Sequence, residues 1–226
     1  DKRAEGFSFD LGGFFIDFSK THLTTELLGK FGELAKSLQV DHKIGALLSG
    51  ERMNISENRA AEHSAERGVG AETSVENSRL LHNRMKSLIG AIDAGALGEI
   101  EHIIHLGIGG SALGPELLID ALKIGDEKYE TAIVSNIDGG ALEPVLEKFD
   151  AHKTLLVIAS KSFTTAETFL NTESVLSWMK QEGVDDPFGK IVALTADPEK
   201  ALEWGVDESR ILPFSETVGG RYSIWS

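Results

Sequence analysis

Apolar side chains recur at helical spacing through the first part of the chain. Residues 24–38 begin with the capping candidates Thr24 and Thr25. Their apolar positions then fall three and four residues apart, at Leu27, Leu28, Phe31, Leu34 and Leu38. Residues 56–68 and 74–95 continue in the same manner, and each stretch closes on a glycine, a common helix C-cap. The pattern predicts a mainly helical segment from about Thr21 to Leu97.

A different pattern precedes these helices. Residues 7–18 alternate between apolar and polar positions and turn at Gly12-Gly13. Two glycines between alternating runs predict a short β-hairpin.

From Glu101 onward, short apolar runs rich in β-branched residues alternate with helical patterns. The runs that predict strands are residues 102–108, 131–137, 154–160, 190–196 and 210–214. The stretches that predict helices are residues 113–123, 141–149, 166–181 and 198–204. This alternation predicts βαβ units, a parallel sheet and helices on both of its faces. We therefore expect an α/β fold with two parts, residues 1–97 and residues 98–226.

Composition narrows the possible functions. The 226 residues are 41% hydrophobic and 26% charged, as in globular proteins. No apolar run is long enough to span a membrane. The formal charge of −14 opposes binding to nucleic acid or to an anionic membrane, so a site for an anion must be locally positive. The chain has no cysteine, which excludes disulfides and fits a cytoplasmic protein.

Both ends suggest a piece of a longer protein. The first residue is Asp1 rather than methionine, and the last residues, GGRYSIWS, are apolar without a polar tail. We therefore expect the second part to be truncated at its C-terminal end.

The first candidate site is the glycine-rich segment HLGIGGSALGP at residues 105–115, between a predicted strand and a predicted helix. Gly107, Gly109 and Ala112 fit a dinucleotide-binding fingerprint, and Asp138 ends the next strand where a ribose-binding acid could lie. A P-loop is excluded, because no Gly-Lys-Ser/Thr follows. A tight strand-to-helix turn without a ligand would need the same glycines.

The second candidate site is SKSFTTAET at residues 160–168. The hydroxyls of Ser160, Ser162, Thr164 and Thr165, together with Lys161, precede the helix predicted from Ala166. One hydroxyl would be enough to cap a helix. Four hydroxyls and a lysine beside free amide groups favour binding of an anion such as phosphate.

The third candidate site is VGGRYSIWS, which follows the fifth predicted strand. Gly219 and Gly220 allow the backbone to approach a ligand closely, and Arg221 stands beside them. Parallel strands bring such loops to one edge of the sheet, where α/β proteins bind ligands. His102 and His105 flank the first strand, and we interpret them as structural residues.

These three segments closely resemble the signatures of the glucose-6-phosphate isomerase (phosphoglucose isomerase) family. IDFSKTHL at residues 16–23 and NISENRAAEHSAER at residues 54–67 resemble its N-terminal segments. The resemblance implies that residues 98–226 form the family's first sugar-isomerase (SIS) domain, a five-stranded, parallel, doubly wound, flavodoxin-like sheet. It also implies reversible isomerisation of glucose 6-phosphate and fructose 6-phosphate through an enediol, in glycolysis and gluconeogenesis.

The resemblance also implies roles for individual residues. It assigns phosphate binding to Ser160, Lys161, Ser162 and Thr165, although the family usually has threonine where Ser162 stands. It assigns sugar contacts to Gly110 and Ser111, and the place beside the reacting carbons to Gly220 and Arg221. By the same resemblance, Glu167 orients a ring-opening histidine. The catalytic candidates are therefore Arg221, Glu167 and Lys161.

The chemistry needs proton transfer and a fixed cation near the enediolate, and it needs neither a metal nor a cofactor. The family's general-base glutamate, its ring-opening histidine and a late lysine lie beyond the Arg221 motif. The resemblance therefore implies an N-terminal portion that is inactive alone and belongs to a homodimer. Two alternatives remain at this point: a sugar-phosphate-binding module without catalysis, and a nucleotide-dependent dehydrogenase that would use the first loop and Asp138.

Overall fold

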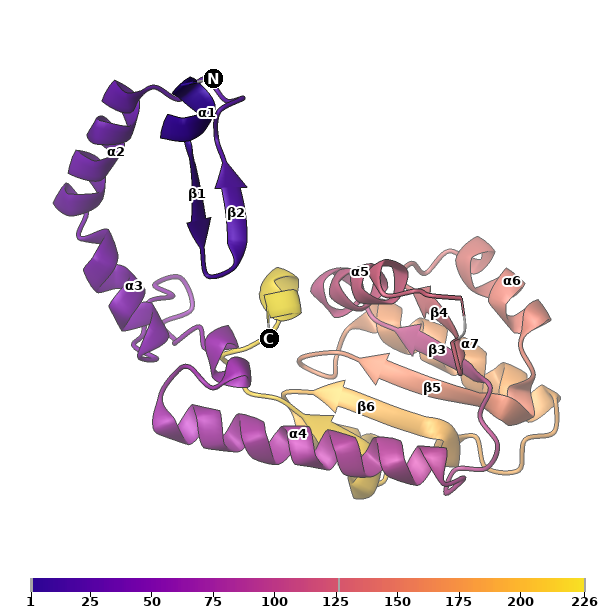
Figure 1. Ribbon diagram of the computed structural model, residues 1–226. Helices are drawn as coiled ribbons and strands as arrows, with labels where there is room; N and C mark the ends of the chain where they lie inside the picture. The colour runs from indigo at the N-terminus through magenta and orange to yellow at the C-terminus, as the bar shows by residue number, and fades with distance from the viewer. Residues whose placement is uncertain (1, 126, 226) are drawn as a thin grey trace. The chain divides into compact units, whose positions relative to one another are not determined.

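The computed structural model describes residues 2–125 and 127–225 (Figure 1). The chain divides into two compact units, Asp1–Leu47 and Leu48–Ser226. In the part of the chain that the structure describes, no helix is both long and apolar enough to cross a bilayer.

The first unit contains the predicted hairpin and the predicted capped helix. Its elements are α1 (Lys2–Gly6), β1 (Ser8–Leu11), β2 (Phe14–Asp17), α2 (Thr25–Ser37) and most of α3 (Val40–Leu48). The two residues of the hairpin turn, Gly12 and Gly13, have φ angles of 57° and 85°, the left-handed values that a two-residue turn requires. Of the two capping candidates, Thr24 is the cap of α2, since its hydroxyl accepts a hydrogen bond from the Leu27 amide at 3.2 Å.

The second unit is built on a sheet of five strands, all parallel, in the order β4-β3-β5-β6-β7. The strands are β3 (His102–Leu106), β4 (Glu130–Val134), β5 (Thr154–Ala159), β6 (Ile191–Thr195) and β7 (Ile211–Pro213). The helices are α4 (Glu72–Asp93), α5 (Leu113–Ala121), α6 (Gly139–Lys148), α7 (Ala166–Gln181) and α8 (Pro198–Trp204). The predicted α/β fold with a five-stranded parallel sheet is therefore confirmed.

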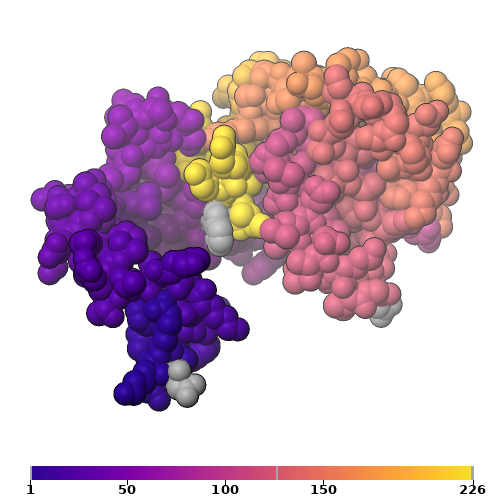
Figure 2. All heavy atoms as spheres, turned by 90° about the horizontal axis from the view of Figure 1, so that it is seen from above, coloured from indigo at the N-terminus to yellow at the C-terminus, as the bar shows by residue number. Residues whose placement is uncertain are grey.

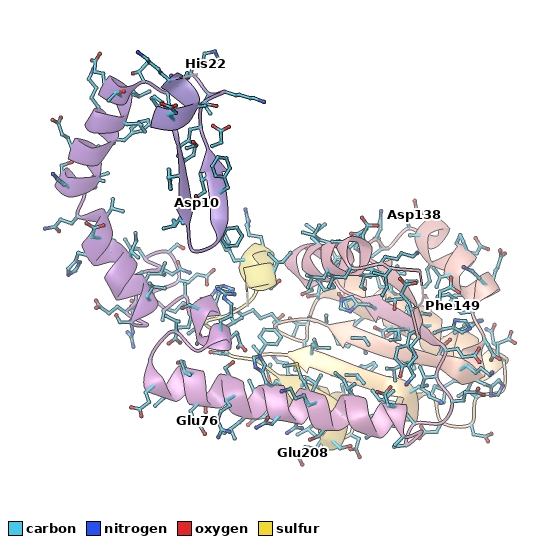
Figure 3. The ribbon with its side chains drawn as sticks, in the orientation of Figure 1. Asp10, His22, Glu76, Asp138, Phe149 and Glu208 are labelled. Carbon is cyan, nitrogen blue, oxygen red and sulfur yellow. The ribbon has the colours of Figure 1, made fainter. Side chains whose placement is uncertain are left out.

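Helices cover the sheet on both faces. On one face, Leu88 of α4 packs with Leu155 and Val192 of the sheet. On the other face, α7 contributes Val175 and Met179 to a larger core that α6 and α8 complete. This core reaches the start of β3, where the Phe149 ring (Figure 3) stacks on His102 with 4.4 Å between ring centroids. Because side chains on both faces of the sheet are packed under helices, its strands read as nearly continuous apolar runs.

Residues 56–68 were predicted to be α-helical, and this prediction is wrong. Asn54 pairs with Arg59 in an isolated bridge, and only His63–Arg67 form a short 3₁₀ helix, η1. The Asn54 side chain accepts hydrogen bonds from Ser56 and Glu57, which offers the backbone a turn instead of a helix. Asn58 then takes a left-handed conformation with a φ angle of 49°, which no α-helix tolerates.

The compact unit that holds the sheet begins at Leu48, because α4 packs on the sheet and η1 packs on α4. The boundary at Leu48 separates two groups of residues that pack mainly among themselves. The prediction that a sugar-isomerase domain begins at residue 98 concerns a different boundary and stays a prediction.

We expect the core under β5 to dominate the stability of the second unit. Leu156 is fully buried, whereas Leu170 on α7 is 54% exposed. Leu156→Ala should lower the free energy of unfolding by about 2–5 kcal/mol, since it leaves a cavity. The matched variant Leu170→Ala should change it by less than about 0.5 kcal/mol. Urea denaturation followed by circular dichroism measures both values, and equal losses would contradict this account of the core.

A candidate site at the carboxyl ends of the strands

The strand order places the candidate loops next to one another. The chain leaves β3 for β4 on one side and returns to β5 on the other, so β3 and β5 flank the switch point of the sheet. Ligands of open α/β sheets bind in the crevice outside such a point. The glycine-rich loop follows β3, and the hydroxyl-rich loop follows β5.

The glycine-rich loop turns sharply after β3. A side chain at Gly107 would place its Cβ 2.8 Å from the carbonyl oxygen of Ser111. The buried His105 ring bonds to that same oxygen through Nε2 at 2.7 Å. Burial lowers the pKa of His105, and the bond to Ser111 opposes this shift. His105 thus supports the turn, as we expected of a structural residue.

The third loop folds back onto the first. A Cβ at Gly110 would lie 2.2 Å from the carbonyl carbon of Gly220, so the two backbones are in direct contact. The Ser223 hydroxyl, within the 3₁₀ helix η6 (Gly220–Trp225), donates to the Gly110 carbonyl at 2.9 Å. In the space-filling view, the C-terminal segment lies against the region of α5 (Figure 2). The missing side chain at Gly110 therefore admits the protein's own backbone.

The hydroxyls of the second loop bond to one another. Ser160 is buried and its Oγ lies 3.0 Å from Thr165 Oγ1, while Ser162 Oγ lies 2.7 Å from Thr164 Oγ1. Thr165 occupies the N-cap position of α7 without a capping hydrogen bond from its side chain. Capping therefore does not account for this cluster of hydroxyls.

Phe163 holds the second loop in place. Its φ angle of 52° is uncommon for a residue with a side chain, and its ring is buried. The ring packs edge-on against Phe169 and Trp204, at centroid distances of 5.0 and 6.0 Å. Such a backbone conformation persists where the surrounding packing determines it, and here it lies within the second loop.

Lys161 connects the second loop to the third. Its Nζ donates to the carbonyl oxygens of Glu216 at 2.6 Å and Val218 at 3.0 Å. Burial and the nearby Arg59 guanidinium lower the pKa of Lys161. Its hydrogen bonds thus hold the segment that leads to Arg221.

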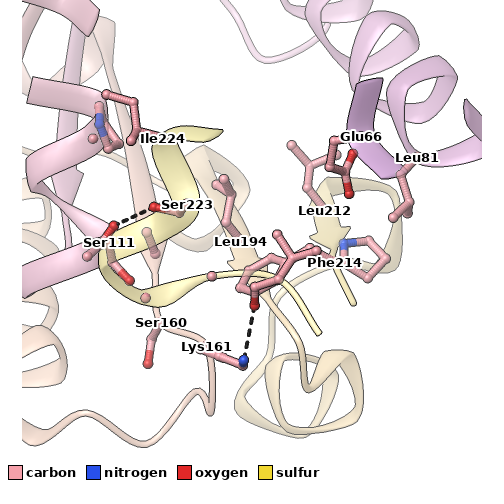
Figure 4. A pocket seen from close by; sticks show the side chains of 18 of the residues that line it. Glu66, Leu81, Ser111, Ser160, Lys161, Leu194, Leu212, Phe214, Ser223 and Ile224 are labelled. Atoms are coloured by element: carbon pink, nitrogen blue, oxygen red, sulfur yellow. Dashed lines mark hydrogen bonds between the residues drawn. The ribbon is translucent and has the colours of Figure 1, made fainter. Parts of the chain in front are cut away.

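Five of the predicted site residues line one cavity of about 290 Å³ (Figure 4): Gly110, Ser111, Ser160, Lys161 and Gly220. In Figure 4, Ser111 and Ser160 stand across the cavity from Glu66 and Leu81. Apolar side chains of α4, α5 and the strand ends form much of its wall: Leu81, Met85, Leu118, Leu194, Leu212 and Phe214.

The other four predicted residues do not line this cavity. Ser162 is exposed in the hydroxyl-rich loop, and Thr165 is half-buried just before α7. Glu167 is exposed in the first turn of α7, and Arg221 is exposed in η6. All four lie in or directly after the loops at the sheet edge, but none of them lines this cavity.

Sequence reasoning missed several residues that shape this site. Glu66 and His82 line the cavity, with 3.1 Å between the Glu66 carboxylate and His82 Nε2. Arg59 donates to the carbonyl oxygen of Glu216 and also bonds to the Glu57 carboxylate. The helix predicted over residues 56–68 hid the contacts of Arg59 and Glu66, because these residues follow a turn that the pattern did not indicate.

Asp138, the candidate for binding a ribose, has a local structural role. Its carboxylate accepts from the Gly140 amide at 3.0 Å and so caps α6 (Figure 3). A helix cap accounts for an aspartate at this position.

The fold and the three loops define a doubly wound α/β protein with a candidate site at the switch point of its sheet. Residues 17–226 match the family model described as phosphoglucose isomerase, and the chain belongs to that family.

The relatives agree with this assignment. The glucose-6-phosphate isomerase of Zymomonas mobilis is 57% identical over 211 residues, which are 93% of this chain and 42% of that protein. The glucose-6-phosphate isomerase of Rhizorhabdus wittichii is 54% identical over 99% of this chain and 45% of its own length. The chain therefore spans less than half the length of these relatives.

A crystal structure of a glucose-6-phosphate isomerase from Chlamydia trachomatis shares the fold. Its TM-score is 0.86 at 24% identity, and the match covers 99% of this chain and 45% of that chain.

The contact between Gly110 and Gly220 generates a prediction. Gly110→Ala would push its Cβ into the Gly220 backbone, whereas a Cβ at Gly139 on α6 would meet nothing within 4 Å. Gly110→Ala should therefore lower the free energy of unfolding by about 1–3 kcal/mol, as overpacking does, and Gly139→Ala should leave it nearly unchanged. Thermal and urea unfolding of both variants test this, and a neutral Gly110→Ala would show that the loops separate easily.

Proposed function

We propose that this chain supplies the phosphosugar-binding part of an enzyme that interconverts glucose 6-phosphate and fructose 6-phosphate. The observation that carries the proposal is the meeting of three loops at the switch point, in a chain of the phosphoglucose isomerase family. The names of its relatives support the same reaction.

The phosphate binds at the start of α7 in this proposal. Anions are stabilised there by amide groups and by the helix dipole. The hydroxyls of Ser160, Ser162 and Thr165 precede this point and bond to neighbouring hydroxyls. The Thr165 side chain, at the N-cap position, makes no capping hydrogen bond to α7. Lys161 adds positive charge there, whereas the charge of Lys200 is offset by Asp197, whose carboxylate lies 2.7 Å from Lys200 Nζ. A locally positive loop is what an anion needs on an acidic protein.

The reacting end of the sugar lies toward Gly110, Ser111, Gly220 and Arg221 in this proposal. Moving a proton between C2 and C1 creates an enediolate, whose negative charge a fixed cation stabilises. Arg221 is exposed beside the junction of the first and third loops and can supply that cation. Glu167 is exposed in the first turn of α7, where it can orient a histidine.

The complete enzyme includes more than this chain in our proposal. The chain corresponds to less than half of its relatives, and we assign it to the N-terminal portion of a cytoplasmic homodimer. Exposed leucines on α5, among them Leu113 and Leu117, are candidates for burial in the complete protein.

The two ends of the substrate should respond differently to substitution. In the full-length enzyme, Thr165→Ala removes one donor to the charged phosphate, a loss of about 1.5–3 kcal/mol. We therefore expect KM for fructose 6-phosphate to rise about tenfold to a hundredfold. Glu167→Ala should mainly lower kcat, because it acts on the proton-transfer machinery. Steady-state kinetics in a coupled assay measure both effects.

The matched control is Thr73→Ala, an exposed threonine on α4, which should change neither constant. If Thr165→Ala lowered only kcat and Glu167→Ala raised only KM, the phosphate and the reacting end of the sugar would occupy exchanged positions.

The 226-residue chain alone should bind phosphate but show no turnover, because the resemblance places the general base beyond Arg221. Calorimetric titration with fructose 6-phosphate and with NAD separates the proposal from the dehydrogenase alternative. Turnover by the purified chain, free of host enzyme, would contradict the proposal that the general base lies outside this chain. A full-length protein that binds fructose 6-phosphate without isomerising it would favour a binding module instead.

A further inference from the structure

Three consecutive backbone carbonyls precede the Gly219–Arg221 loop, and each one is held from outside the loop. The Glu216 carbonyl accepts from Arg59 and from Lys161. The Thr217 carbonyl accepts from the Glu62 amide at 3.1 Å. The Val218 carbonyl accepts from Lys161 at 3.0 Å. We call this set of hydrogen bonds the carbonyl clamp.

The donors of the clamp come from two parts of the second unit that are themselves fixed. Lys161 follows β5 directly. Glu62 is buried, and its carboxylate accepts from Ser74 of α4 at 2.8 Å, which joins it to the helix on the sheet. Arg59 lies in the bridge with Asn54, and the Glu57 carboxylate holds its Nε. The bond between Arg59 and Glu57 also lowers the pKa of Glu57.

The carbonyl clamp ends at Val218, directly before two glycines with positive φ angles. Gly219 and Gly220 have φ angles of 116° and 64°, a region that residues with side chains rarely adopt. The two glycines alone would let the following residues sample many conformations. The clamp fixes the chain before them, and the bond from Ser223 to Gly110 fixes it after them. Arg221 lies between these two fixed points.

We propose that Arg59 is a positioning residue, which holds the Glu216 carbonyl so that Arg221 is presented to the substrate in one orientation. The inference rests on the proposed function, because it assigns Arg221 to the reacting end of the sugar. Arg59 itself touches neither the substrate nor the reacting atoms in this proposal. Its effect passes through the backbone of residues 216–220.

The first test measures the loop directly in the 226-residue chain. Arg59→Met should raise the hydrogen-exchange rate of a peptide spanning residues 214–222 by about tenfold, whereas peptides from β5 should exchange as in the wild type. Arg79→Met is the matched control, because Arg79 also pairs with a nearby glutamate, Glu76, but on the exposed surface of α4. It should leave the exchange of residues 214–222 unchanged.

The second test measures catalysis in the full-length enzyme. Small misplacements of a catalytic group cost large factors in rate, so Arg59→Met should lower kcat about tenfold to a hundredfold. KM for fructose 6-phosphate should change less than about threefold, since the phosphate loop is intact. Arg59→Lys can reach one of its two partners and should recover part of kcat. Arg79→Met should leave both constants unchanged.

A third variant covers the case in which Arg59→Met fails to fold. Glu57→Gln keeps Arg59 but weakens its hold, and it should shift exchange and kcat in the same direction by a smaller factor. Unchanged exchange in every folded variant would overturn the clamp. Faster exchange with an unchanged kcat would overturn the positioning role. A wild-type full-length protein without turnover would overturn the proposed function, and the exchange measurement would still decide whether the clamp exists.

Discussion

The arrangement of the candidate site depends on one constraint, the direct contact of the Gly110 and Gly220 backbones. The two residues are far apart in sequence, yet a single methyl group at Gly110 would collide with the Gly220 carbonyl carbon. This contact can exist only because β3, which leads into the first loop, lies near the centre of the sheet. The chain after β7 returns and packs, through η6, on the turn that follows β3 and on α5. The first and third loops are thus joined by backbone packing, and the Lys161 side chain joins the second loop to the third.

The fold could be predicted from sequence where local pattern and tertiary packing agree. Helix α7 occupies the predicted residues 166–181, and α8 the predicted residues 198–204, because glycine, proline and hydroxyl residues mark their ends. The five strands were found because parallel strands buried on both faces have continuous apolar runs. Residues 56–68 failed because their alanine, glutamate and arginine favour a helix, while Asn54 and Asn58 form a turn. A pattern averaged over a dozen residues does not reveal the effect of two asparagines that form a turn.

The candidate site could be predicted only in part, for a related physical reason. Hydroxyls and glycines in a loop are visible in a sequence, and the structure brings Gly110, Ser111, Ser160, Lys161 and Gly220 around one cavity. The groups that hold the third loop are carbonyl oxygens, which every residue possesses. No sequence pattern can therefore show that Arg59, Glu62 and Lys161 converge on residues 216–218. The sequence assigned Lys161 to phosphate binding and did not indicate that its Nζ would also bond to the carbonyls of the third loop.

Because Lys161 bonds to carbonyl oxygens and not to a carboxylate, its charge has a different effect on the site. A lysine that pairs with a carboxylate loses most of its external field, because the two charges cancel. The hydrogen bonds of Lys161 go to two neutral carbonyls, so no directly bonded carboxylate of the described residues cancels its positive charge. Burial and the neighbouring Arg59 lower the pKa of Lys161, while the charges of Glu57 and Glu216 act in the opposite direction. A chain with a formal charge of −14 thereby keeps one cation at the wall of the cavity that no carboxylate in the described part of the chain bonds directly. The hydrogen bonds that order the third loop are thus the same ones that leave this cation available to an anion, so the position of the loop and the charge of the site are set by one structural device.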